Sequence, residues 1–149
     1  MATPPVSLKG RALRLLSARE YSREELARKL APHEDTPGAL ARVLDELQAK
    51  DFINEQRVLE SVVYRRAAKL GTARIRQELQ AKGLAPQAVA EAVAQLRTTE
   101  VERAREVWRK KFGSAPRDAA ERARQMRFLA ARGFGGDAIR RVVAGADEA

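Results

Sequence analysis

The sequence predicts an all-α protein built from three tandem three-helix repeats that form an elongated, curved array. Leucine recurs at a spacing of about 50 residues, at Leu30, Leu79 and Leu129, in a chain rich in alanine, leucine, arginine and glutamate. Apolar residues between these positions follow helical spacing, and alternating strand patterns are nearly absent. A fixed period of this length is typical of stacked helical units. We therefore expect function on a surface before we expect it in a pocket.

The expected boundaries follow this period. We predict helical repeats at 7–53, 54–98 and 99–144, with a disordered lead-in at 1–6 and a frayed tail at 145–149. Two consecutive prolines disfavour helix in the lead-in, because proline lacks a backbone donor and restricts the residue before it.

The first repeat contains three apolar stripes separated by helix-breaking segments. The first stripe runs from Leu8 to Leu16, and a capping box at 22–25 then starts a second helix. The segment 31–38 holds two prolines and a glycine and is the predicted turn. After it, apolar residues at 40–47 recur at i, i+3, i+4 and i+7, which predicts the third helix.

The second repeat begins at Asn54, a residue type that commonly caps the amino end of a helix. Its middle helix is expected at 72–82 and stops at Gly83. Pro86 then opens the third helix at a first-turn position, where the missing N–H costs nothing.

Gly83 and Gly133 are predicted to end equivalent helices in the second and third repeats. Each glycine has the apolar pair that accompanies a Schellman turn, Leu79 with Leu84 and Leu129 with Phe134. The glycine-rich segment 133–137 also resembles a phosphate-binding loop, but the second repeat keeps only the glycine that stops the helix. Helix termination is therefore the favoured interpretation.

The third repeat carries aromatic residues at helical spacing. Trp108 and Phe112 lie one turn apart, and we favour a core position for Trp108 over a stacking role. Later apolar residues at 126–129 and 139–143 predict the remaining helices.

The charge balance favours a polyanionic partner, or a protein that coats a polyanion. Lysine and arginine number 29 against 20 acidic residues, giving a net charge of +9 and a pI near 10.6. A well-solvated surface is the alternative, and charge alone does not choose between DNA, RNA, membrane and acidic protein. With no cysteine and no long apolar stretch, we expect a cytoplasmic protein that does not enter a membrane.

Residues suited to catalysis or metal binding are scarce. His33 is the only histidine and lies in the predicted proline-rich turn, so no histidine relay or multi-histidine metal site can form. The acidic residues are interleaved with lysine and arginine at helical spacings, as surface ion pairs are. We expect no enzyme activity, no catalytic residue, no metal and no cofactor.

The segment 61–77 contains five basic residues and no acidic one, and Tyr64 lies among them. Guanidinium groups in such a cluster can bind phosphates or an acidic protein groove. A solvated helix face is the alternative for any single residue. The primary candidates for partner or DNA binding are Tyr64, Arg65, Arg66, Lys69, Arg74 and Arg76. A secondary basic set, diluted by glutamates, comprises Arg103, Arg105, Arg109, Lys110 and Lys111.

Three segments, taken in order, resemble the RecX family of recombinase regulators. They are SREELARKL at 22–30, GTARIRQELQAKGL at 71–84 and RFLAARGF at 127–134. The resemblance extends over 7–143. It departs from the family pattern at 54–58, where the family usually has an acidic residue followed by Arg-Phe, and in the first turn, which lacks a lysine-glycine stop.

The resemblance implies three tandem three-helix units and a non-enzymatic role. The family binds the RecA recombinase, lodges in the groove of its nucleoprotein filament and restrains strand exchange, ATP hydrolysis and co-protease activity in the SOS response. DNA binding is also implied. Lys82 falls in the family's most recognisable stretch, which adds it to the primary candidates.

Two functions therefore compete. The first is a monomeric modulator of the RecA filament, with weaker contacts to single- or double-stranded DNA. The second is a helix-turn-helix-like protein that acts on DNA directly, since three-helix units of this size resemble such domains.

Overall fold

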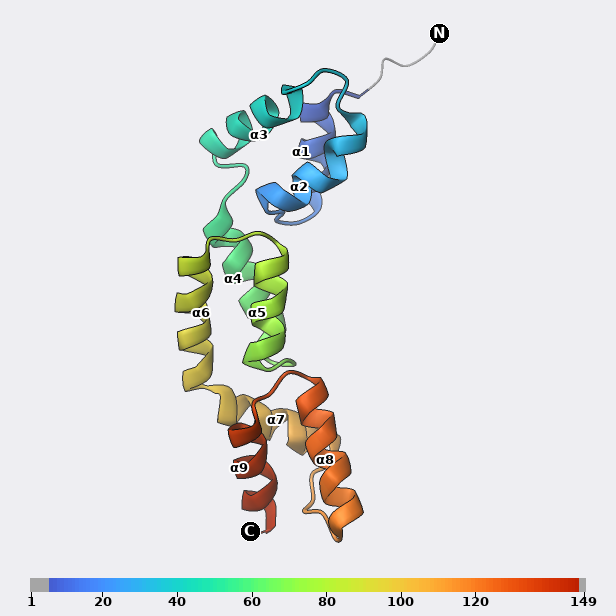
Figure 1. Ribbon diagram of the computed structural model, residues 1–149, viewed down its shortest axis with the longest axis vertical. Coiled ribbons are helices and arrows are strands. Elements are labelled where there is room, and N and C mark those ends of the chain that lie inside the picture. Colours follow the sequence, from blue (N-terminus) through green and yellow to red (C-terminus); the bar gives the residue numbers. More distant parts are fainter. Residues whose placement is uncertain (1–5, 148–149) are drawn as a thin grey trace. The chain divides into compact units, whose positions relative to one another are not determined.

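The computed structural model describes residues 6–147 and arranges them into nine α-helices and one short 3-10 helix (Figure 1). No strand occurs within that range. The predicted all-α class is confirmed. The described chain separates into two compact units, one formed by 6–61 together with 81–84, the other by 62–80 together with 85–147.

Both predicted terminal segments fall partly outside the described range. Residues 1–5 of the expected lead-in and residues 148–149 of the expected tail are not described. The last helix, α9 (Gly136–Asp147), continues past the point at which we expected fraying to begin.

The first repeat consists of α1 (Leu8–Ala18), α2 (Arg23–Leu30) and α3 (Ala39–Ala49). The predicted turn between the second and third helices holds the 3-10 helix η1 (Ala31–His33). The three α-helices enclose an apolar core. Its buried members are Ala12, Tyr21, Leu26, Leu30, Leu40, Leu44, Leu47 and Ile53.

The amino end of α2 is closed by side chains as the sequence predicts. The Ser22 hydroxyl accepts a hydrogen bond from the backbone N–H of Glu25 at 3.1 Å, and the Glu25 carboxylate accepts one from the Ser22 N–H at 2.9 Å. The capping box is thus confirmed. Helix α3 follows Gly38, which has no side chain, and the Glu34 carboxylate instead accepts from the Leu40 N–H at 2.8 Å.

The middle repeat consists of α4 (Glu55–Arg66), α5 (Thr72–Ala81) and α6 (Pro86–Thr98). Asn54 caps α4, since its side-chain oxygen accepts from the Arg57 N–H at 2.9 Å. Each of the three helices contributes buried apolar residues. They include Val58, Val62, Ile75, Leu79, Val89, Val93 and Leu96.

The third repeat consists of α7 (Glu100–Lys111), α8 (Ala119–Ala131) and α9, which packs against both of the others. Trp108 is only 9% exposed, so its predicted core position is confirmed. The indole N–H of Trp108 donates to the Gln125 side-chain oxygen at 2.8 Å inside this core.

The two predicted helix-stop glycines adopt the left-handed conformation, with φ of 72° at Gly83 and 94° at Gly133. Beyond α8, the Phe134 N–H donates to the Leu129 carbonyl at 3.2 Å and the Gly133 N–H to the Ala130 carbonyl at 3.0 Å. This is the Schellman pair of bonds. Helix termination at Gly133 is therefore confirmed, and these two N–H groups are not available to a phosphate.

In the second unit, the start of α5 lies against the end of α8. The Gly71 N–H donates to the Arg132 carbonyl at 2.8 Å, and the Arg74 guanidinium donates to the Ala131 carbonyl at 2.8 Å. A Cβ on Gly71 would overlap backbone atoms of Gly133. The second and third repeats therefore meet where the backbone at Gly71 lies close to the backbone at Gly133, and any side chain at position 71 would prevent this contact.

An equivalent junction occurs in the first unit, between α2 and the segment 81–84. The Arg28 guanidinium donates to the Ala81 carbonyl at 2.6 Å, and a Cβ on Gly83 would overlap the Glu24 side chain. In this junction the Glu55 carboxylate accepts from the Arg23 N–H at 3.4 Å. Burial raises the pKa of Glu55 above its usual range.

Candidate functional site

The structure gives two of the primary candidate arginines intramolecular roles. The Arg66 guanidinium forms an ion pair with Glu78 at 3.0 Å. Arg74, as described above, holds the carbonyl of Ala131. The absence of acidic residues from 61–77 therefore does not leave all of its arginines available, because partners come from outside the segment.

Tyr64, Arg65 and Lys69 form an exposed group that we call the α4 basic end. Tyr64 is 87% exposed, the highest value among the large hydrophobic residues described. Arg65 lies in the last turn of α4 and Lys69 in the turn that follows it; both are exposed, and neither side chain has a hydrogen-bond or ion-pair partner within the described part of the chain. Arg76 is also exposed and unpaired, but it lies on α5, two positions from Arg74 and therefore on a different side of that helix.

Lys82 is nearly enclosed, with a side chain only 13% exposed, and pairs with Glu25 at 3.0 Å. Burial acts to raise the pKa of Glu25, but hydrogen bonds from the Ser22 N–H, Lys82 and Arg19 outweigh it and hold the pKa below its usual range. Lys82 thus contributes to the junction within the first unit.

In the secondary basic set, Arg103 is half-buried and bonded along its whole guanidinium. From α7 it donates to the Leu70 carbonyl at 2.6 Å, to the Leu96 carbonyl at 3.0 Å and to the Thr72 hydroxyl at 3.1 Å. Burial lowers the pKa of Arg103, although an arginine stays charged. Arg103 thus bonds to the turn that follows α4, to the start of α5 and to α6, instead of facing a partner.

Two other members of the secondary set line a cavity of about 590 Å³ together with Trp108. Arg105 pairs with Glu102 at 2.5 Å and Arg109 pairs with Glu106 at 2.7 Å, so both charges are locally balanced.

The last two members of the set, Lys110 and Lys111, are exposed at the end of α7. The ammonium of Lys111 lies 5.4 Å from the centre of the Phe128 ring, within the range of a cation–π interaction. Lys110 has no partner among residues 6–147.

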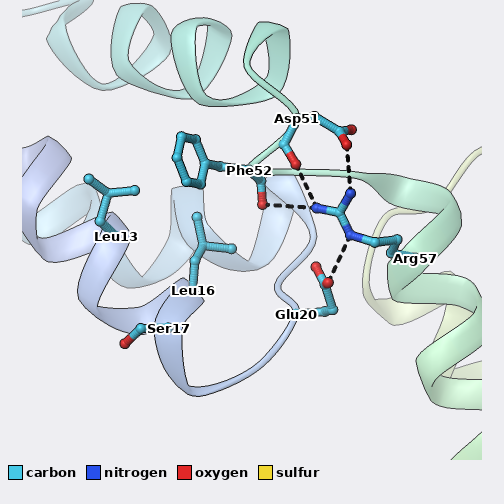
Figure 2. A pocket seen from close by; sticks show the side chains of 7 residues that line it. All are labelled: Leu13, Leu16, Ser17, Glu20, Asp51, Phe52 and Arg57. Atoms are coloured by element: carbon cyan, nitrogen blue, oxygen red, sulfur yellow. Dashed lines mark hydrogen bonds and ion pairs between the residues drawn. The ribbon is translucent and has the colours of Figure 1, made fainter.

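Arg57 connects the first repeat to the start of α4, a role that the sequence did not indicate. Figure 2 shows its guanidinium between Glu20 and Asp51, with hydrogen bonds of 2.8 Å to each carboxylate and 2.6 Å to the Asp51 carbonyl. The hydrogen bond to Glu20 raises the pKa of Arg57. Beside it lies a cavity of about 260 Å³, where Phe52 is 47% exposed.

Neither a metal centre nor a membrane span is found in the described range. Within 6–147 no group of three or more histidine, aspartate or glutamate side chains could hold a metal ion. None of the helices described there is long and apolar enough to cross a bilayer.

Three tandem three-helix domains define a helical-repeat protein, a class whose members bind partners on their surfaces. Models of the RecX family match all three, as its first three-helix domain at 9–47, its second at 54–93 and its third at 98–143. The chain belongs to the RecX family of regulatory proteins.

Individual relatives agree with this assignment. Regulatory protein RecX of Leptothrix cholodnii is 57% identical over 144 residues, which cover 97% of this chain and 92% of the relative. Regulatory protein RecX of Ralstonia nicotianae is 48% identical over 149 residues, covering 99% of this chain and 94% of the relative.

Solved structures show the same fold. The crystal structure of RecX from Lactobacillus salivarius has a TM-score of 0.76 at 22% identity and covers 95% of this chain and 96% of its own. A second crystal structure of regulatory protein RecX has a TM-score of 0.74 at 19% identity, with coverage of 93% and 71%.

Proposed function

We propose that this protein modulates RecA by binding its nucleoprotein filament, where it restrains strand exchange, ATP hydrolysis and co-protease activity during DNA repair and the SOS response. Membership of the RecX family supports a regulatory role. The observation that carries the proposal is the α4 basic end, which combines a large exposed aromatic side chain with two exposed, unpaired cations. The proposed target is a cytoplasmic filament, so the proposal includes a cytoplasmic location. It also includes action as a monomer.

The α4 basic end has the chemistry of an interface. Exposed aromatic residues and arginines are enriched at the positions that contribute most to binding between proteins. The guanidinium of Arg65 can form two parallel hydrogen bonds to a carboxylate or phosphate. Cations near the carboxyl end of α4 also interact favourably with its helix dipole. This interaction can explain the presence of Arg65 at this position, but it cannot explain an exposed tyrosine at position 64.

The repeated architecture suits a repeated target. Three linked domains that each make a weak contact with successive protomers of a filament would bind far more tightly together than singly. Lys110 and Arg76, exposed on other repeats or helices, are further candidates for such contacts.

The test uses the double variant Arg65→Gln/Lys69→Gln in the full chain, with Arg97→Gln/Arg127→Gln as a control of equal charge change. Arg74 is left unchanged because it holds the Ala131 carbonyl. Substoichiometric protein is added to the cognate recombinase on DNA at moderate salt, and ATP turnover and filament lifetime are followed.

The unaltered protein is expected to change turnover, and the double variant to need roughly tenfold more protein, as expected for two exposed contacts of about 0.7 kcal/mol each. The control should match the unaltered protein. If the unaltered protein changes neither turnover nor filament lifetime, the proposal is wrong.

The alternative, a helix-turn-helix-like protein that acts on DNA directly, is supported by the net charge of +9. It predicts tight binding to bare DNA that weakens steeply with salt, in proportion to the phosphates neutralised. High affinity for bare DNA combined with no effect on the recombinase would favour this alternative.

A further inference from the structure

Four cationic or hydrogen-bonding side chains of the first repeat face one cavity of about 240 Å³. They come from three successive elements: Arg11 and Arg14 from α1, Lys29 from the last turn of α2, and His33 from η1. The remaining lining is apolar. It consists of Leu15 and Leu30. We call this cavity the Arg11 pocket.

No acidic residue lines the Arg11 pocket, and none of its four polar side chains has a hydrogen-bond or ion-pair partner in the described range. The neighbouring Lys9 behaves differently, since it pairs with Glu46 at 2.6 Å. The positive charge at the pocket is therefore uncompensated by the protein, although one compensated cation, Lys9, lies in the same helix.

Helix dipoles explain only part of this arrangement. Lys29 lies in the last turn of α2, where positive charge is favourable. Arg11 and Arg14 lie on α1, which contains no acidic residue, and at a spacing of three they share one side of that helix. Their mutual repulsion is not offset within the fold, whereas a bound anion would offset it.

We infer that the Arg11 pocket binds phosphate groups of a nucleic-acid backbone. Two guanidinium groups, an ammonium and an imidazole can together bond several phosphate oxygens. Each guanidinium can donate two parallel hydrogen bonds to one phosphate. The size of the cavity and its leucine side accommodate a phosphate with part of its sugar. This inference deepens the proposed function, because it assigns the contacts with DNA to named residues of the first repeat, and its tests contain no recombinase.

The first experiment measures binding of the full chain, without recombinase, to a fluorescent oligothymidylate and to a duplex. The variant is Arg11→Gln/Lys29→Gln, and Arg97→Gln/Arg127→Gln is the matched control, since all four residues lack a partner in the described range. Neutral substitution of unpaired, surface-accessible side chains should leave the melting temperature unchanged.

Each phosphate contact on a single strand contributes a salt slope of about −0.7, so that losing two contacts should weaken binding about 25-fold at ~0.1 M salt and reduce the slope by about 1.4. Weaker binding of the variant to either the oligothymidylate or the duplex supports the inference, and the ligand affected shows which form of DNA the pocket binds. If the variant binds both like the control, the inference is wrong. A variant that keeps DNA binding and loses only regulation of the recombinase would also overturn it, in favour of an acidic protein partner.

The second experiment uses His33 as a reporter, because it is the only histidine of the chain. Its ring signals in a proton NMR spectrum are therefore unique. Titration with the oligothymidylate, and separately with inorganic phosphate, is expected to shift these signals in the unaltered protein and not in Arg11→Gln/Lys29→Gln. Signals that stay in place while the oligonucleotide binds would show that the phosphates bind elsewhere.

Discussion

Gly71 gives the sharpest test of how the second and third repeats are joined. It stands just before α5, and a Cβ at this position would overlap the carbonyl group of Gly133 and the backbone nitrogen of Phe134. These are backbone atoms, so no change of side-chain rotamer can relieve the overlap. The substitution Gly71→Ala must therefore push α5 and the end of α8 apart.

The expected loss follows from the hydrogen bonds that this separation breaks. They are Gly71 N–H to Arg132 carbonyl at 2.8 Å, Ala73 N–H to Gly133 carbonyl at 3.3 Å, and Arg74 guanidinium to Ala131 carbonyl at 2.8 Å. At a net contribution of about 1 kcal/mol each, Gly71→Ala should lower the free energy of unfolding by about 3 kcal/mol. For a chain of this size that corresponds to a fall of roughly 6–12 °C in melting temperature.

The assay is urea denaturation followed by helix content and by the fluorescence of Trp108, the only tryptophan. Gly145→Ala is the control, because a Cβ there meets nothing within 4 Å and alanine is the better helix former. That control should be unchanged or more stable by up to about 1 kcal/mol. A Gly71→Ala protein with the unfolding midpoint of the unaltered chain would refute the reasoning.

Two further predictions concern a buried hydrogen bond and a surface ion-pair group. Gln125→Leu removes the acceptor of the buried Trp108 N–H and the donor to the Ser114 carbonyl, and should destabilise the chain by about 1–3 kcal/mol with a shift in tryptophan emission; a variant as stable as the unaltered chain would contradict this. Hydrogen bonds from Lys9 and Lys50 lower the pKa of Glu46 from 4.5 to about 2. The stabilisation that they supply is therefore present above pH 4.5 and is lost as the pH falls towards 2. Glu46→Gln should flatten the dependence of the urea midpoint on pH in that window. If the pH profiles of Glu46→Gln and the unaltered chain superimpose, this prediction is wrong.

The helix boundaries could be predicted because the signals that set them are local. Ser22, Asn54 and Gly133 each act on backbone groups no more than five residues away, so the spacing of residue types suffices to identify them. The Arg11 pocket could not be predicted, because its basic side chains come from three elements that face one another only after folding.

The candidate surface shows the same division. Counting charges identified the acid-free segment 61–77, and the exposure of Tyr64 agrees with its predicted place on the surface. Counting could not distinguish Arg65, which is unpaired, from Arg66, whose partner Glu78 lies on the next helix. Nor could it show that the Arg103 side chain bonds to the turn after α4 and to α6.

By itself, then, the sequence determined the repeat, its helical class, the helix starts and stops and the excess of positive charge, because each depends on residues close together along the chain. Only the tertiary structure decided which cations remain available to a partner. The reason is physical: a hydrogen bond requires its atoms to lie within about 3 Å, and for pairs such as Arg74 and Ala131 only folding brings them that close.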